Sequence, residues 1–260
     1  MTTHSCFPPA SRREFRPTAI FPHIFWLLAL LPTGVAQAVE FRTVEVAGKR
    51  ITVCQVDVRK ESLQLFHRDE NSQPFKRFER LSTWLGARGQ KLTFAMNGGM
   101  YHGDFSPVGL FVSGGRELFP LNVAKGEGNF FLKPNGVFAI TEKGARIVEA
   151  SEYPRLGERV ILATQSGPLL LRGGRMHPAF NANSTNRLFR NGVGVPSPDV
   201  ALFAISEAPV NFHEFATMFR DTLRCPDALF LDGTISSLHS TKLNRSDFRM
   251  DLGPIIAVTE

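Results

Sequence analysis

Four short apolar runs in this chain each end at a glycine that stands next to a polar side chain. They lead into Asn97-Gly98-Gly99, Ser166-Gly167-Pro168, Arg190-Asn191-Gly192 and Asp232-Gly233. Glycine after a buried strand permits positive φ and lets the backbone approach a ligand closely. The repeated layout therefore favours a β-rich fold in which several strand ends carry the chemistry. If those ends meet, they form one pocket.

The remaining segments predict the same β-rich organisation. Residues 40–57 alternate apolar and polar around the turn Ala47-Gly48-Lys49-Arg50, which is typical of a β-hairpin. Leu63 to Phe66 predicts a third strand, and Asn129 to Leu132 a further strand in a meander. The late strands are expected over residues 199–206, 228–231 and 254–258.

Two segments change to helical spacing. From Pro74 to Gly86 apolar residues recur on one helical face, and proline suits the first turn of a helix. Asn211 and Glu214 form the pattern of a capping box, so we expect a second helix from Asn211 to Leu223. The sequence thus predicts an α+β fold, a single domain of twisted, mostly antiparallel β-sheets with two main amphipathic helices.

Residues 1–38 have the features of an export signal. Arg12, Arg13 and Arg16 precede the apolar stretch Ile24 to Leu31, and Ala36-Gln37-Ala38 fits a cleavage site. We therefore expect a signal peptide over 1–38, a domain over 39–260 and an exported, periplasmic protein without a stable membrane span; a retained N-terminal anchor is the alternative. The paired arginines also fit the twin-arginine motif, which leaves the export route, Sec or twin-arginine, open.

Charge and cysteine content narrow the function classes. The chain after residue 38 keeps 27 basic and 23 acidic residues, dispersed along it, so we expect no nucleic-acid partner. Cys54 and Cys225 remain after the signal and can either pair in an exported protein or stay as buried free thiols. No Cys-x-x-Cys or His-x-x-x-His spacing is present, so we expect no zinc site.

The stretch Ala95 to Val112 holds the densest set of polar groups. Tyr101, His102, Asp104 and Ser106 follow the two glycines before the chain returns to an apolar strand. An ordinary strand-turn-strand has the same local pattern. The number of ligand-type groups between two buried strands favours a site, with this stretch as one wall of a pocket.

Together the four strand ends supply a carboxylate, a guanidinium, an amide and a hydroxyl. If they converge, Arg190 can chelate two phosphate oxygens and Asp232 can act as base or nucleophile. Structural alternatives are an Asx turn for Asp232, a surface ion pair for Arg190 and a turn cap for Asn97. Ser166 lacks the Gly-x-Ser-x-Gly elbow, so we do not expect a serine nucleophile.

The segments NGGMY, SPVGL, SGPLL, RNGVGV and LDGTIS follow in this order over roughly residues 90–258. Their order and spacing resemble the phosphodiester glycosidase family, which includes the enzyme that uncovers mannose 6-phosphate by removing N-acetylglucosamine from a phosphodiester. The chain is most similar to a bacterial exported branch of that family. Family members usually have two glycines after the aspartate, whereas Thr234 follows Gly233 here. This departure concerns the shape of the turn and the choice of substrate.

The resemblance implies cleavage of the glycosidic bond of a sugar phosphodiester or phosphorylated glycan. Because the leaving phosphate is a stable anion, one carboxylate and an arginine can replace the two carboxylates of a conventional glycosidase. We expect Asp232 as base or nucleophile, Arg190 as phosphate clamp and Asn97 as the third, positioning member of the catalytic set. The expected substrate-binding residues are Gly98, Gly99, Tyr101, Asp104, Ser166, Gly167, Asn191, Gly233 and Ser236.

One rival function uses the same pocket without cleavage, namely a non-catalytic periplasmic module that binds anionic glycans. No cofactor or metal is predicted, although Asp104 and Asp232 can share a divalent cation if they lie close together. The residues carry no signal for the oligomeric state or the aglycone.

Overall fold

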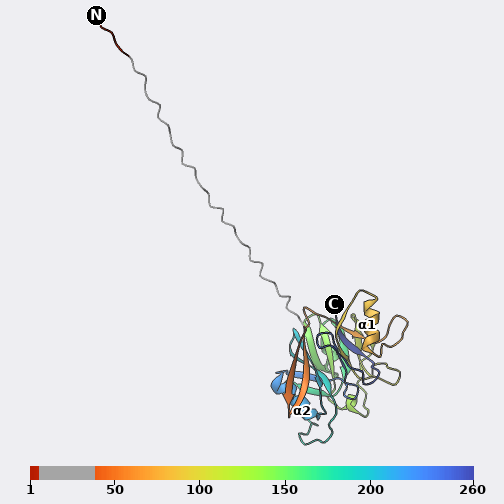
Figure 1. Cartoon of the computed structure of the whole chain (residues 1–260). Helices are drawn as coiled ribbons and strands as arrows, with labels where there is room; N and C mark the ends of the chain where they lie inside the picture. The colour runs from red at the N-terminus through yellow and green to blue at the C-terminus, as the bar shows by residue number, and fades with distance from the viewer. Residues whose placement is uncertain (6–38) are drawn as a thin grey trace. The chain divides into compact units, whose positions relative to one another are not determined.

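Three antiparallel β-sheets form the framework of the part of the chain that the computed structural model describes, residues 1–5 and 39–260 (Figure 1). Every strand pairing among these residues is antiparallel, and α1 and α2 are the two main helices. The predicted α+β fold class is therefore confirmed. The expected signal peptide falls almost wholly outside the described residues. None of the described helices has the length and apolar character that crossing a membrane requires.

The largest sheet has seven strands. Its order is β1 (Val39–Val46), β2 (Lys49–Asp57), β13 (Val200–Ser206), β12 (Asn191–Ser197), β14 (Asp227–Phe230), β10 (Leu169–Arg172) and β11 (Arg175–Met176). The β1–β2 hairpin turns at Ala47 and Gly48, both at positive φ, with Val46 opposite Lys49. This is the hairpin that the sequence predicts.

Two further sheets have five strands each. The β4 sheet has the order β16 (Arg245–Ser246), β15 (Leu238–Ser240), β4 (Leu92–Asn97), β17 (Ile255–Thr259) and β3 (Ser62–Phe66). The β9 sheet has the order β6 (Arg116–Phe119), β5 (Phe111–Ser113), β9 (Val160–Ser166), β7 (Gly136–Thr141) and β8 (Gly144–Glu149).

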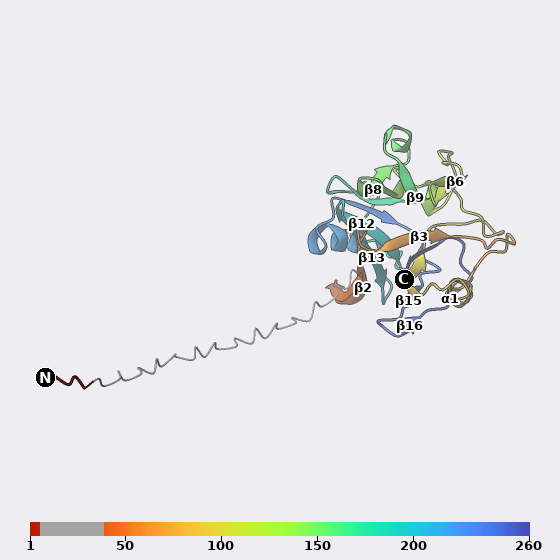
Figure 2. The ribbon, with the colours of Figure 1, turned by 90° about the horizontal axis from the view of Figure 1, so that it is seen from above.

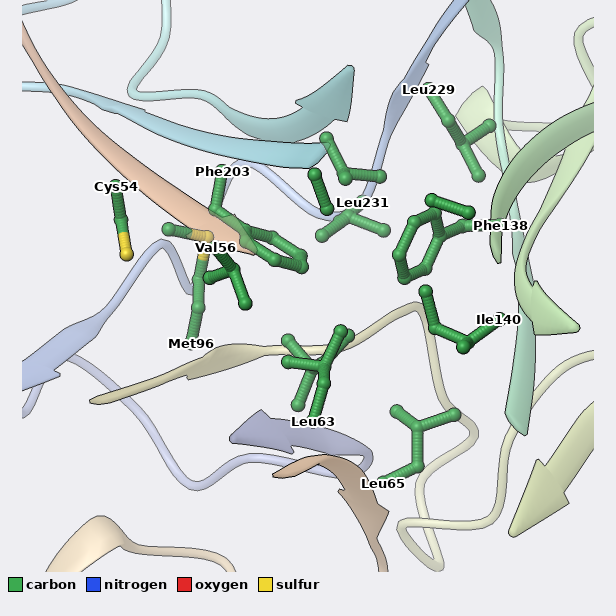
Figure 3. Close-up of a cluster of buried hydrophobic side chains, with 14 of the residues drawn as sticks. Cys54, Val56, Leu63, Leu65, Met96, Phe138, Ile140, Phe203, Leu229 and Leu231 are labelled. Carbon is green, nitrogen blue, oxygen red and sulfur yellow. The ribbon is translucent and has the colours of Figure 1, made fainter. Parts of the chain in front are cut away.

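The three sheets each turn one face toward a shared hydrophobic core. Phe203 from the seven-stranded sheet, Met96 from the β4 sheet and Phe138 from the β9 sheet meet there (Figure 3). In Figure 2 β6, β8 and β9 lie toward the top of the domain, β15 and β16 toward the bottom, and β12 and β13 between them. The period of two along each strand decides which residues enter this core. Phe138 points into it, whereas its neighbour Ala139 lies in a separate cluster on the outer face of β7.

Helices cover the outer faces of two sheets. α1 (Phe78–Gly86) packs its apolar face in a cluster with residues of β4 and β17, and α2 (Phe212–Thr217) packs over the seven-stranded sheet. The predicted capping box is confirmed, since the Glu214 amide donates to Asn211 Oδ1 at 2.8 Å and the Asn211 amide to Glu214 Oε2 at 3.0 Å. The helix continues as a π-helical turn, Met218–Thr222. Two 3₁₀ turns, Asn129–Phe131 and Tyr153–Arg155, lie on loops.

Two local predictions are wrong. The first helix begins at Phe78 rather than Pro74, because Pro74 pairs with Arg68 in a β-bridge and Lys76 has a positive φ of 63°. Asn129 to Leu132 is not a strand, because the chain turns as a 3₁₀ helix there.

The cysteines are the free, buried thiols that formed one of the two alternatives. Cys54 points into the shared core and Cys225 into the cluster under α2, so they lie in different hydrophobic clusters of the domain.

A glycine on β12 sets how closely α2 and its π-helical turn approach the sheet. A Cβ at Gly194 would stand 2.6 Å from the Phe219 ring and 2.7 Å from Cys225 Sγ. Gly194→Ala therefore overpacks this interface, and we expect a loss of about 1–3 kcal/mol in the free energy of unfolding, measured by urea titration. Gly103→Ala is the matched control, since nothing lies within 4 Å of its added Cβ, and it should change stability by less than about 0.5 kcal/mol. Equal effects of both changes would contradict this account of the packing.

Candidate active site

Strands from all three sheets end at one place beside the shared core. β4 ends at Asn97, β9 ends at Ser166, β12 begins at Asn191, and Asp232 follows β14 by two residues. The hydrogen bonds described below join these four residues or their immediate neighbours. The convergence that the sequence layout favours is thus found for these four strand ends.

Two asparagines hold the backbone of Asp232. The amide of Asp232 donates to Asn191 Oδ1 at 2.9 Å, and its carbonyl accepts from Asn97 Nδ2 at 3.2 Å. The asparagines bond to each other through Asn191 Nδ2 and Asn97 Oδ1, and Asn97 Oδ1 also accepts from the Ser237 amide at 3.1 Å. Both side chains are fully buried. Their polar atoms are therefore occupied in fixing one turn.

Serine hydroxyls complete the support of this turn. Ser166 Oγ donates to the carbonyl of Leu231, directly before the aspartate. Ser236 Oγ donates to the carbonyl of Gly233 at 2.8 Å and lies 3.2 Å from that of Asp232. Sequence reasoning missed Ser237, because a backbone amide bonded to a distant asparagine leaves no local pattern.

These contacts change the expected tasks of four residues. Asn191, Ser166 and Ser236 were expected to bind substrate and Asn97 to position it, but all four are buried and bonded to the protein. For Asn97 this is the turn-capping alternative. The physical reason is that a turn between three sheets leaves buried backbone groups, which need partners. The structure makes these four side chains positioning residues for Asp232.

Asp232 is half-buried as a residue, and its carboxylate is poorly solvated. Burial raises its pKa to about 7, and the amides of Thr234 and Gly233 oppose that rise. A carboxylate that titrates near neutral pH can serve as a base or, when ionised, as a nucleophile. Only glycine fits at position 233, because the backbone of Phe189 packs closely against it and a Cβ there would stand 2.6 Å from the Phe189 carbonyl oxygen.

The wall formed by Ala95 to Val112 lies beside this turn. The Gly98 amide was expected to face substrate, but it donates to the Pro254 carbonyl at 2.7 Å. Gly99 has φ of 154°, and a Cβ there would stand 2.8 Å from Thr164 Oγ1. Burial raises the pKa of Tyr101, and the charges of Asp232 and Asp251 raise it further.

Two predicted residues stay apart from the Asp232 turn. Asp104 is exposed, and its carboxylate accepts from the amide and hydroxyl of Ser106 in an Asx turn. Gly167 packs against Asn135 and the carbonyl of Phe130. Neither has a hydrogen bond to the four strand-end residues among the described part of the chain. Within the same part, no group of three or more His, Cys, Asp or Glu side chains is placed to hold a metal ion.

Arg190 lies on the other face of β12 from Asn191. Its side chain is 1% exposed, with Nε donating to the Val210 carbonyl at 2.9 Å and Nη2 to that of Asn186 at 3.2 Å. The guanidinium stacks 3.5 Å from the Phe212 ring centre and 5.6 Å from that of Phe230. Nη1 has no partner among the described residues, and burial lowers the pKa of Arg190 to about 10.

A small cavity of about 90 Å³ borders this guanidinium. Phe180, Asn181, Ser184 and His213 also line it. The surface ion pair that was the alternative for Arg190 is absent from its described contacts, so this buried cation borders the cavity without a counter-charge. Phe230 links the two halves of the site, because its ring also lies 3.1 Å from the Cβ position of Gly233.

One cation at the rim was not foreseen. Arg249 is exposed and lies 3.8 Å from the ring centre of Phe189, the residue whose carbonyl covers Gly233. Its sequence neighbourhood has no glycine or strand end, so the layout of the other segments gave no signal for it.

Known proteins share this fold and sequence. The family model described as phosphodiester glycosidase matches residues 90–255. The uncharacterized protein YigE of Escherichia coli (strain K12) is 32% identical over 216 residues, which cover 83% of this chain and 84% of that protein. A hypothetical protein from Synechocystis aligns with a TM-score of 0.52 and 16% identity, over 85% of this chain and 61% of that one.

A glycosidase also has this fold. The catalytic domain of zebrafish N-acetylglucosamine-1-phosphodiester alpha-N-acetylglucosaminidase, auto-inhibited by its pro-peptide, aligns with a TM-score of 0.57 and 14% identity over 85% of this chain and 81% of that one. At this identity the likeness is one of fold. This chain belongs to the phosphodiester glycosidase family.

Burial of Asp232 carries a cost that depends on pH. The folded pKa of about 7 lies above the ordinary value of 3.8, so the folded state binds more protons between about pH 4 and 7 and loses stability as pH rises through that window. Asp232→Asn removes this loss, and we expect it to raise the free energy of unfolding by about 1–3 kcal/mol at pH 8 and by little at pH 4. Thermal melts of both proteins at the two pH values measure the difference. A variant less stable than wild type at pH 8 would show that the ionised carboxylate is paired.

Proposed function

We propose that this protein is an exported, periplasmic hydrolase that cleaves the glycosidic bond of a sugar phosphodiester in a cell-envelope or extracellular glycan. The observation that carries the proposal is Asp232, a half-buried residue whose carboxylate has a pKa of about 7, on a turn fixed from three sheets. Membership of the phosphodiester glycosidase family supplies the substrate class. The name of the zebrafish enzyme makes N-acetylglucosamine the first sugar to test.

The proposed hydrolysis requires few catalytic side chains. The bond between the anomeric carbon and the phosphate oxygen breaks, the electron pair leaves with the phosphate, and the oxygen of water ends on the anomeric carbon. Ionised Asp232 either accepts the proton of that water or attacks the anomeric carbon first and is released by water. Because the phosphate leaves as a stable anion, the step needs no second carboxylic acid and no resident cofactor.

The phosphate is assigned to Arg190 in this proposal. A buried charge without a counter-charge is costly, and an anion in the adjoining 90 Å³ cavity would satisfy Nη1. Arginine suits this task because its planar fork matches phosphate oxygens. The Phe230 ring lies between Arg190 and the turn that carries the reacting carboxylate, with contacts to both.

Removal of the carboxylate tests the reaction. We expect Asp232→Ala to lower kcat on N-acetylglucosaminyl methyl phosphate at least about 100-fold while KM stays within about threefold. Alanine is preferred to asparagine for turnover, because an Asn-Gly pair deamidates slowly to isoaspartate and some aspartate. A small fraction of restored aspartate would supply activity, whereas it would not affect a melt of freshly purified protein. Release of N-acetylglucosamine is the readout, and Asp104→Asn should retain turnover within about threefold. Full turnover by Asp232→Ala, or binding of the diester by wild type without release, would contradict the proposal, and the second result would favour the glycan-binding module.

The pH profile follows from the same pKa. Because the ionised carboxylate is the active form as base or nucleophile, kcat/KM should rise with pH and level off above about pH 7. Initial rates at low substrate from pH 4 to 9, with enzyme recovery checked at each pH, measure this limb. A profile that falls through pH 7 would instead make Asp232 an acid in the rate-limiting step.

The phosphate assignment has its own variant. Arg190→Lys keeps the charge but loses the planar fork, so we expect KM for the diester to rise at least about tenfold with a smaller change in kcat. Inorganic phosphate should raise the melting temperature of wild type and have little effect on this variant. Arg220→Lys, an exposed ion-pair change, is the control. An unchanged KM and the same phosphate response in Arg190→Lys would remove Arg190 from the site.

A further inference from the structure

A second, larger cavity lies at the edge of the seven-stranded sheet. It has a volume of about 610 Å³ and follows the β10–β11 hairpin. Its apolar lining comes from Pro134, Leu169, Leu171, Met176 and Pro178. A cavity of this size and composition is typical of small-molecule sites in proteins. Neither the Asp232 turn nor the Arg190 cavity contributes a residue to it.

One polar atom in this lining is buried and lacks a hydrogen bond of strict geometry. His177 is 5% exposed, and its Nδ1 accepts the amide proton of Ala179 at 3.2 Å. The ring proton of the neutral imidazole therefore sits on Nε2, which is buried and interacts with the backbone of Lys133 outside strict hydrogen-bond geometry. The cavity thus has at most one imidazole donor within a largely apolar surface.

His177 also connects this cavity to the Arg190 cavity. Its ring stacks on Phe180 with 4.8 Å between centres, and Phe180 lines the Arg190 cavity. Phe180 in turn stacks on Phe212, which covers the guanidinium of Arg190. The consecutive residues Pro178 and Ala179 line the larger and the smaller cavity respectively. The two cavities are therefore neighbours, separated by the short segment from His177 to Phe180.

We propose that the β10–β11 cavity is the aglycone subsite and that it takes an apolar group, an alkyl or aryl chain esterified to the far side of the phosphate. This inference rests on the proposed function and adds the class of substrate. The lining decides between an apolar aglycone and a second sugar. A sugar needs many hydrogen-bond partners once it leaves water, whereas this cavity offers at most one buried donor and the guanidinium of Arg175 at its exposed edge. Arg172, the other charged residue there, is held by Glu149 and Glu152.

Two substrates that differ only in the aglycone test this assignment. Each methylene buried from water is worth about fourfold in binding, so N-acetylglucosaminyl hexyl phosphate should have a kcat/KM at least about tenfold above that of the methyl ester. Met176→Trp fills the cavity from the half-buried edge strand β11, and we expect it to remove this preference while turnover of the methyl ester stays within about twofold. Met176→Phe, a smaller change, should give an intermediate ratio.

Leu118→Trp is the matched control, because it adds the same indole to an exposed position on another edge strand, β6. It should keep the wild-type preference for the hexyl ester. Equal kcat/KM for both esters in wild type, or an equal loss for both in Met176→Trp, would overturn the assignment.

A direct binding measurement separates this inference from the proposed function. Hexyl phosphate, which has no glycosidic bond, should bind wild type and Leu118→Trp in calorimetry, and Met176→Trp should bind it at least about tenfold more weakly. If neither ester is hydrolysed but this pattern is seen, the cavity assignment holds and the hydrolase proposal fails. If the esters are hydrolysed and hexyl phosphate binds all three proteins alike, the cavity assignment fails alone. Hexyl phosphate that binds none of them, with the esters hydrolysed or not, also overturns the assignment.

Discussion

A buried hydrogen bond between the side chains of Asn97 and Asn191 joins the β4 sheet to the seven-stranded sheet. The other polar atom of each asparagine bonds to the backbone of Asp232. Asn97 donates to its carbonyl, and Asn191 accepts from its amide. Buried polar networks of this kind stabilise only when every member has a partner, because an unpaired group inside a protein costs about 1–3 kcal/mol. The position of Asp232 therefore depends on both sheets at once. The hydrogen bond from Ser166 to Leu231 adds the β9 sheet to the same turn.

This support explains how a poorly solvated carboxylate can persist. Burial pushes the pKa of Asp232 to about 7, and no cation pairs with it among the described residues. Such a group weakens the fold at neutral pH, and a fold tolerates it where its position is over-determined by the surroundings. Arg190 presents the same situation with the opposite sign, as a buried guanidinium whose Nη1 has no partner. Two uncompensated charges of opposite sign lie on either side of β12 and Phe230, and a cavity of about 90 Å³ adjoins Arg190.

Local sequence patterns predicted the elements better than the site. The capping box at Asn211 and the turn at Ala47-Gly48 are decided by neighbouring residues, and both are found. The prediction that the first helix begins at Pro74 was wrong, because Pro74 forms a β-bridge with Arg68 and Lys76 forms one with Leu252. A local sequence pattern does not reveal such contacts. The strand expected at Asn129 failed in the same way, where the chain curls before β7.

For the site, the layout of strand ends indicated which residues meet but not what their side chains do. Asn97 and Asn191 were expected at the substrate, and only the packing of two sheets shows that they bond to each other. One feature of the sequence does predict that Arg190 lies apart from Asp232. Arg190 and Asn191 are consecutive, and neighbours in an extended chain point to opposite faces. Once Asn191 faces the turn, Arg190 must face α2.

Thr234 stands where a second glycine is usual in the family that the sequence resembles. Gly233 is the sterically required position, since the carbonyl of Phe189 leaves no room for a Cβ, and its φ is not positive. Thr234 is exposed, and its amide still supports the carboxylate of Asp232. The turn thus carries a side chain at 234 without burying it, two residues after Asp232, whose amide is fixed by Asn191. In the proposed reaction, the hydroxyl and methyl group of Thr234 would therefore border the sugar rather than the phosphate, because Phe230 separates this turn from Arg190.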